Sequence, residues 1–267
     1  WHSAFSNNII ILYMNIDNPK NVIRIERDEL ALNYKYREGG EFLNNIDICS
    51  YEYEFPELNR RYDFHPIEFV PQVGDTYVKN PFGENVYIKI EYFSDYILEC
   101  KSNCISNIAR LLGASSYSFE IEVEDISNRS WDLKAGMSYS SVSAELQVKR
   151  ATQERLNKRF ADRKLYSHGR RPTAQEFREA EDFAKQYGLY TDNKVKALLN
   201  ERNPNSANMV RQMCVTFSLS QEMNQSLDIA FKLNAMKGVF GLNAAFNEAT
   251  EQKKTINGKL DIQFGCD

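Results

Sequence analysis

Glycine, proline and histidine are scarce in this sequence, and no long hydrophobic run is present. Twelve glycines and seven prolines in 267 residues argue against long flexible linkers between domains. No segment approaches the roughly 20 consecutive apolar residues that a membrane-spanning helix needs. The first residues also lack the basic start and apolar core of a secretory signal. We therefore expect a folded intracellular protein, located in the cytoplasm.

Cysteine occurs in an odd number, so the thiols cannot all pair with one another. The five are scattered along the chain: Cys49, Cys100, Cys104, Cys214 and Cys266. Cys100 and Cys104 lie one helical turn apart, but no second pair of Cys or His lies nearby in sequence to complete a zinc site. Reduced, structural thiols are therefore expected, as in a reducing cytosol. The sequence predicts no metal site and no cofactor.

The common catalytic motifs are missing too. We find no glycine-rich phosphate loop, no dinucleotide fingerprint and no Gly-x-Ser-x-Gly nucleophile elbow. The three histidines, His2, His65 and His168, show no metal-ligand spacing. His65 stands two residues after Asp63, so an enzyme with a Cys/His site is kept as one alternative function. No catalytic residue is assigned, and no small-molecule ligand is indicated.

The sequence does contain clear strand and helix patterns. A helix is predicted at 94–112, because apolar residues recur there every three or four positions and Gly113 follows. Apolar runs, most of them alternating with polar residues, predict strands at 8–16, 22–25, 30–36, 51–55, 86–90, 117–123, 131–139, 142–148, 215–219, 227–233, 240–246 and 260–264. We predict an α+β fold: antiparallel β-sheet meanders with one core helix at about 94–112 and a charged helical insertion at about 150–211.

The insertion interrupts the run of strands with two or three short helices. Gly169 and Pro172 break its first helix, and Thr173 and Glu176 form a capping box for the next. Asn257-Gly258 is a hairpin signal near the end of the chain. We treat 1–267 as a single domain. The alternative is a β-rich N-terminal lobe at 1–92 and a C-terminal lobe at 93–267 that contains the insertion.

The first part of the insertion is positively charged, whereas the whole chain has a negative net charge. The formal net charge is −4, yet nine basic and two acidic residues lie between positions 149 and 171. The basic residues are Lys149, Arg150, Arg155, Lys158, Arg159, Arg163, Lys164, Arg170 and Arg171. Such a block is either a solvated helix face or a surface for an anionic partner. Because the N-terminal half is acidic, we predict a non-catalytic protein that binds another protein or assembles with itself through this surface.

A membrane-active, pore-forming β-protein is a further alternative. Residues 226–247 alternate apolar with small polar residues, as a hairpin with one face in lipid requires, and Lys237-Gly238 marks the turn. Residues 183–188 are faintly similar to the helix end before the Tyr-Gly-Thr-His signature of perforin-like proteins, but Leu189 and Tyr190 replace Thr-His. That signature is therefore absent. An anionic membrane or a nucleic acid is the other partner considered, although a pI near 5.6 argues against nucleic acid.

Overall fold

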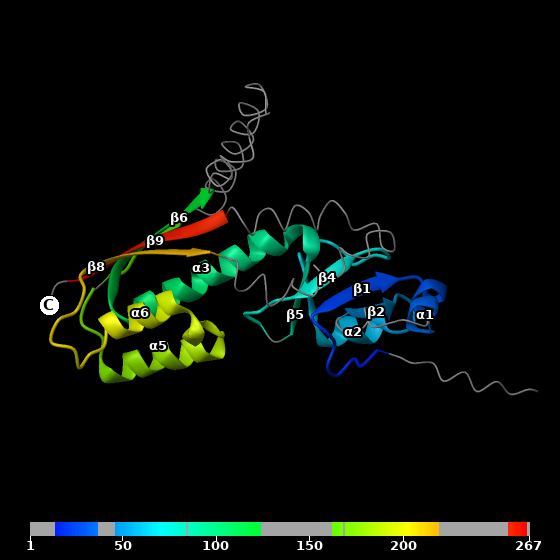
Figure 1. Cartoon of the computed structure of the whole chain (residues 1–267), viewed down its shortest axis with the longest axis horizontal. Coiled ribbons are helices and arrows are strands. Elements are labelled where there is room, and N and C mark those ends of the chain that lie inside the picture. Colours follow the sequence, from blue (N-terminus) through cyan, green and yellow to red (C-terminus); the bar gives the residue numbers. More distant parts are fainter. Residues whose placement is uncertain are drawn as a thin grey trace, which may run out of the picture. The chain divides into compact units, whose positions relative to one another are not determined.

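The computed structural model describes residues 14–36, 46–83, 85–123, 162–167, 169–218 and 256–265. They form two compact units (Figure 1). The first unit contains the described residues up to position 92 except 81–83, and the second contains the remainder. The predicted α+β class is confirmed, because helices accompany a mixed five-stranded sheet and an antiparallel four-stranded sheet.

The first unit is built on the five-stranded sheet, whose strand order is β2-β1-β4-β5-β3. Strand β1 runs parallel to β2 and antiparallel to β4, while β5 runs antiparallel to β4 and parallel to β3. The predicted meander is therefore wrong for this sheet, which contains two parallel pairs. The strands are β1 (Val22–Glu26), β2 (Ile46–Ser50), β3 (Asp63–His65), β4 (Thr76–Lys79) and β5 (Val86–Lys89).

A helix and a turn replace two strands that the sequence pattern predicted in this unit. Helix α1 (Asp28–Tyr36) covers the predicted strand at 30–36, with acidic residues in its first turn and Lys35 in its last turn. It connects the parallel strands β1 and β2, which a tight hairpin cannot join. The predicted strand at 51–55 is a turn that leads into α2 (Phe55–Arg61), where Pro56 occupies the first turn.

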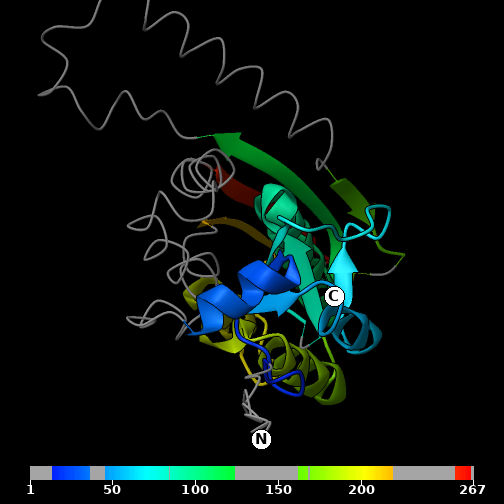
Figure 2. The same cartoon turned by 90° about the vertical axis from the view of Figure 1, so that its right-hand side faces the viewer.

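The second unit places helix α3 (Phe93–Leu111) between a sheet and two further helices (Figure 1). This helix confirms the prediction for 94–112. The sheet has the order β7-β6-β9-β8, and β6 runs beside β9 in both views (Figure 1, Figure 2). Its strands are β6 (Ala114–Val123), β7 (Asp162–Leu165), β8 (Gln212–Ser218) and β9 (Ile256–Phe264).

The helical insertion is confirmed at α5 (Ala174–Gln186) and α6 (Asn193–Glu201) and corrected at 162–165, while its residues 150–161 lie outside the described residues. Both helices lie within 150–211, joined by the 3-10 turn η5 (Leu189–Thr191). Residues 162–165, however, form the strand β7 and pair with β6. The predicted strands at 131–139, 142–148, 227–233 and 240–246 lie outside the described residues, as does most of 8–16.

Side-chain caps explain where α5 and α6 begin. Thr173 and Glu176 form the predicted capping box: the Glu176 amide donates to the Thr173 hydroxyl at 3.2 Å, and the Thr173 amide donates to the Glu176 carboxylate at 2.8 Å. The bond from the Thr173 amide holds the pKa of the Glu176 carboxylate below its usual value. Asp192 accepts from the amide of Lys194 at 2.8 Å and so caps α6. Each cap satisfies amides that the helix itself leaves without partners.

We expect Thr173→Ala to lower the free energy of unfolding by about 1 kcal/mol, because it removes the side-chain acceptor of the capping box. Urea unfolding followed by circular dichroism measures the change. Lys196→Ala, an exposed helix substitution that leaves both caps intact, is the matched control and should change stability far less. Equal effects of the two substitutions would contradict a stabilising role for the box.

Candidate functional site

Both long segments that interrupt the four-stranded sheet leave from the same end of it. Val123 at the end of β6 pairs with Ile256 at the start of β9, and Ser218 at the end of β8 pairs with Asn257. Asp162, the first residue of β7, pairs four positions before the end of β6. The chain therefore departs into 124–161 and into 219–255, two segments of nearly equal length, at one edge of the molecule's second unit.

A stacked pair of phenylalanines crosses the sheet at this end. Phe119 on β6 and Phe217 on β8 stack with ring centroids 6.0 Å apart, over Gly258 of the intervening strand β9. A Cβ atom at Gly258 would lie 2.4 Å from the Phe217 ring, so a larger residue would force the two rings to move. The predicted hairpin turn at Asn257-Gly258 is wrong, because both residues lie inside β9. The glycine instead admits the contact between the two strand pairs.

A buried ion pair attaches the helices to the sheet. Lys101 of α3 is 1% exposed, and its Nζ atom donates to Asp192 at the start of α6 at 2.9 Å. The same Nζ lies 5.0 Å from the centre of the Phe217 ring. Burial of Asp192 opposes its ionisation, but the charge and hydrogen bond of Lys101 prevail and lower the pKa of this carboxyl. One side chain thus links α3, α6 and β8.

A second buried cation, Arg202, binds backbone carbonyls at the opposite end of the sheet. Arg202, after α6, donates to the carbonyls of Leu112 at 3.1 Å, Val210 at 3.0 Å and Arg170 at 3.2 Å. Its guanidinium lies 4.2 Å from the centre of the Phe264 ring, near the end of β9. Because these carbonyls come from three separate segments, Arg202 holds together the chain ends that meet there.

The sequence prediction missed both buried cations. Lys101 did carry a signal, since it lies four residues after Ile97 and four before Ile105, in the middle of the apolar stripe of α3. A lysine in that position needs a buried anion or a route to solvent. Arg202 carried no comparable signal, because its partners are backbone carbonyls that any residue supplies.

The predicted basic residues are only partly described. Lys149, Arg150, Arg155, Lys158 and Arg159 lie outside the described residues. The other four are not gathered by one helix: Arg163 and Lys164 lie on β7, while Arg170 and Arg171 precede α5. Their charges are used in different ways.

Three of these four residues make contacts within the chain. Lys164 donates to Asn103 and Ser106, both at 3.3 Å. Arg170 forms an ion pair with Glu176 at 2.5 Å, and Arg171 donates to the carbonyl of Pro204 at 2.6 Å. Arg163 is exposed on β7. The described half of the basic block therefore supports the local structure as well as carrying charge.

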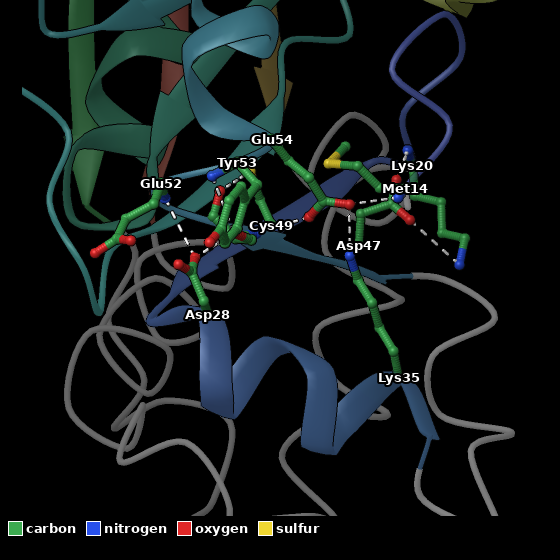
Figure 3. A network of polar contacts seen from close by, with 10 residues as sticks. Met14, Lys20, Asp28, Lys35, Asp47, Cys49, Glu52, Tyr53 and Glu54 are labelled. Carbon is green, nitrogen blue, oxygen red and sulfur yellow. Dashed lines mark hydrogen bonds and ion pairs between the residues drawn. The ribbon is translucent and has the colours of Figure 1, made fainter. Parts of the chain in front are cut away.

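The first unit contains a network of polar contacts at the carboxyl ends of the parallel strands β1 and β2 (Figure 3). The buried Glu54 carboxylate accepts from the Lys35 ammonium at 2.5 Å, the Met14 amide at 2.6 Å and the Ser50 amide at 2.7 Å. Asp28 accepts from the Ser50 hydroxyl. This is where ligands bind in many open α/β sheets. Here each of these carboxylates already binds groups of its own chain, so the network ties α1 and the turn before α2 to the sheet.

Cys49 and His65 cannot form a catalytic pair. Cys49 lies on β2 and His65 on β3, the two outer strands of the five-stranded sheet. Four strand spacings of about 4.8 Å separate such positions by about 19 Å. Burial also raises the pKa of the Cys49 thiol far above its usual value and that of Cys104 to about 12, which leaves both thiols protonated and unreactive. His2, His168 and Cys266 lie outside the described residues.

Comparisons with protein-family models, curated proteins and solved structures give no match for this chain. Within the ranges that the structure covers, no group of three His, Cys, Asp or Glu side chains is arranged to hold a metal ion. None of the helices described is both long enough and apolar enough to cross a membrane.

We expect Asp192→Asn to lower the free energy of unfolding by about 3 kcal/mol at neutral pH, because it leaves the buried Lys101 ammonium without its carboxylate. The double variant Lys101→Met/Asp192→Asn should recover most of that loss, since it removes both charges. Urea unfolding of the wild type, both single variants and the double variant measures the coupling. Losses that simply add in the double variant would rule out the ion pair as a stabilising unit.

The same pair predicts a dependence on pH. The folded state lowers the pKa of Asp192, so its contribution is complete above the unfolded value of about 3.9 and disappears as the pH falls through the lower folded value. The stability difference between wild type and Asp192→Asn should therefore shrink in acid. A difference that is constant from neutral pH into that acid range would contradict the assignment.

Proposed function

We propose that this chain is a self-assembling, membrane-inserting β-protein, whose segments 124–161 and 219–255 cross a bilayer as two hairpins. The observation that carries the proposal is the shared departure point of these segments at one end of the four-stranded sheet. Hairpins that extended β6 with β7, and β8 with β9, would continue an existing sheet in one direction. The order of the strands in the four-stranded sheet would stay the same.

The sequence of the first segment supports a hairpin with one apolar face. Apolar residues occupy odd positions from 131 to 139 and even positions from 142 to 148, with the phase change at Ser140-Ser141. In a hairpin with a two-residue turn, directly opposed residues face the same side of the sheet. A turn at Ser140-Ser141 sets Met137 opposite Ala144 and Leu133 opposite Val148. The phase change therefore keeps the apolar residues together.

The second segment has the same property around Lys237-Gly238. A two-residue turn there sets Leu233 opposite Leu242 and Ile229 opposite Phe246. The alternating runs in both segments contain seven to nine residues. A tilted transmembrane strand needs about 9–11 residues, so each run is close to the required length.

Open strand edges support self-assembly. In the strand order of the described sheet, β7 and β8 are the two outer strands. Two unlike edges of one sheet can join neighbouring copies head to tail, which closes into a ring when the rotation permits. The basic surface remains a second proposed contact. Charge reversal at Arg155, Lys158, Arg159 and Arg163 should weaken assembly most at low salt if that surface contributes.

We expect the purified protein to release dye from lipid vesicles and Leu233→Arg to abolish release, because a charge on the lipid face of a strand costs about 2–4 kcal/mol near the bilayer centre. Asn234→Arg is the matched control, one position away on the opposite face, and should retain release. Leu146→Arg and Gln147→Arg make the same comparison in the first segment. Equal release by the two members of each pair, or none from the wild type, would sink the proposal.

We expect Thr216→Pro to prevent assembly while leaving the monomer folded. The Phe264 amide donates to the Arg211 carbonyl at 2.8 Å, and hydrogen-bonded pairs alternate along an antiparallel ladder. The amide of Thr216 therefore points to the open edge of β8, where proline removes a donor without breaking the β8–β9 ladder. Thr216→Val keeps that donor and is the control. Sedimentation of protein extracted from vesicles should show assemblies for Thr216→Val and none for Thr216→Pro. Equal assembly of the two variants would exclude the β8 edge as the contact between copies.

A further inference from the structure

An exposed apolar loop projects from the first unit, remote in sequence from the segments 124–161 and 219–255. It spans residues 66–73 between β3 and β4 and is called the apolar loop below. Ile67 is 77% exposed, Val70 74%, Phe69 50% and Val73 39%. Among the described residues, these four make up half of the large hydrophobic side chains with substantial exposure. Single exposed apolar residues are ordinary, whereas a contiguous group marks a site of interaction.

The apolar loop is held in place by contacts that leave its apolar side chains outside. The Phe69 amide donates to the Pro66 carbonyl at 3.2 Å, and the Gln72 amide donates to the Asp75 carboxylate at 2.9 Å. Asp75 is itself fixed by an ion pair with Lys89 at 2.7 Å. The exposure of Ile67 and Val70 is therefore a property of an ordered loop.

The chemistry of the apolar loop fits a bilayer better than a protein surface. Its exposed apolar side chains are aliphatic except for one phenylalanine, whereas the anchors of protein interfaces are enriched in tryptophan, tyrosine and arginine. Phe69 stacks on the half-buried Tyr92, with ring centroids 5.6 Å apart. A tyrosine beneath an apolar tip supplies the amphipathic ring that favours the level of lipid headgroups.

The charge of the apolar loop indicates which lipids it would meet. Glu68 is its only charged residue, so attraction to anionic headgroups contributes nothing to its binding. We propose that the apolar loop inserts into the boundary between headgroups and acyl chains of zwitterionic lipid, and so docks the protein before any hairpin crosses the bilayer. The choice of a bilayer as partner rests on the proposed function. Docking through apolar side chains should persist at high salt.

Flotation of the full-length protein with phosphatidylcholine vesicles at high salt tests this proposal. We expect the wild type to float with the vesicles and Ile67→Ser/Val70→Ser to lower the partition coefficient by at least about tenfold, since two apolar side chains no longer leave water. Leu165→Ser is the matched control, because Leu165 is 73% exposed on β7 of the other unit. Its partition should equal that of the wild type.

A second variant reports insertion directly. Ile67→Trp, made in a Trp1→Phe/Trp131→Phe background, places the only emitting indole ring at the tip. Its emission should move to shorter wavelength when vesicles are added. An unchanged emission overturns the proposal, as does a wild type that stays in solution, which would instead assign the apolar loop to a protein partner. Equal loss of flotation in the Leu165→Ser control overturns it too.

The two functional proposals fail in different ways. Flotation without dye release contradicts hairpin insertion and leaves docking by the apolar loop intact. Dye release with undiminished flotation of Ile67→Ser/Val70→Ser contradicts docking by the apolar loop and leaves hairpin insertion intact.

Discussion

The ladder between β6 and β9 is the constraint on which the second unit depends. It runs from Ala114 paired with Phe264 to Val123 paired with Ile256, and it is the only link in the described sheet between the β6–β7 pair and the β8–β9 pair. Its register places the side chains of Tyr117, Phe119 and Ile121 on the buried face of the sheet. Leu260 and Ile262 of β9 are buried there as well. A slip of one residue would expose all of them at once, so the apolar pattern fixes the register and the register fixes where both long segments depart.

The attachment of α5 and α6 to this sheet relies on directional polar contacts beside ordinary apolar packing. Lys101 meets Asp192 across the interior, and Arg202 meets three backbone carbonyls at the far end. Buried charges add little net stability over an apolar replacement, but they penalise every arrangement in which a partner is missing. The contacts therefore specify one position for the helices. The close approach of Gly169 to Gly265, where either added Cβ would collide with the other backbone, imposes a similar restriction near Arg202.

Local patterns predicted the elements whose signals are local. Helix α3 and the capping box at Thr173 follow from spacing within a few residues, and strand β6 follows from alternation over 117–123. The strand predicted from the alternation at 30–36 is wrong, because the parallel strands β1 and β2 need a crossover connection there. Their parallel pairing cannot be read from the residues of one segment. The ion pair of Lys101 was not predicted for the same reason, since its carboxylate partner lies 91 residues further along the chain. Parallel pairing and buried ion pairs are decided by segments that meet only in the folded state.

Under the proposed function, the hydrogen bonds of the backbone couple assembly to membrane insertion. Inside a bilayer no water satisfies an open strand edge, so strands cross it only as closed barrels. One chain with two hairpins supplies four strands, whereas the smallest such barrels have about eight. Under the proposed function a single copy therefore cannot insert stably, and at least two must pair edge to edge first. The outer strands of the described sheet, β7 and β8, are where this pairing between copies would occur.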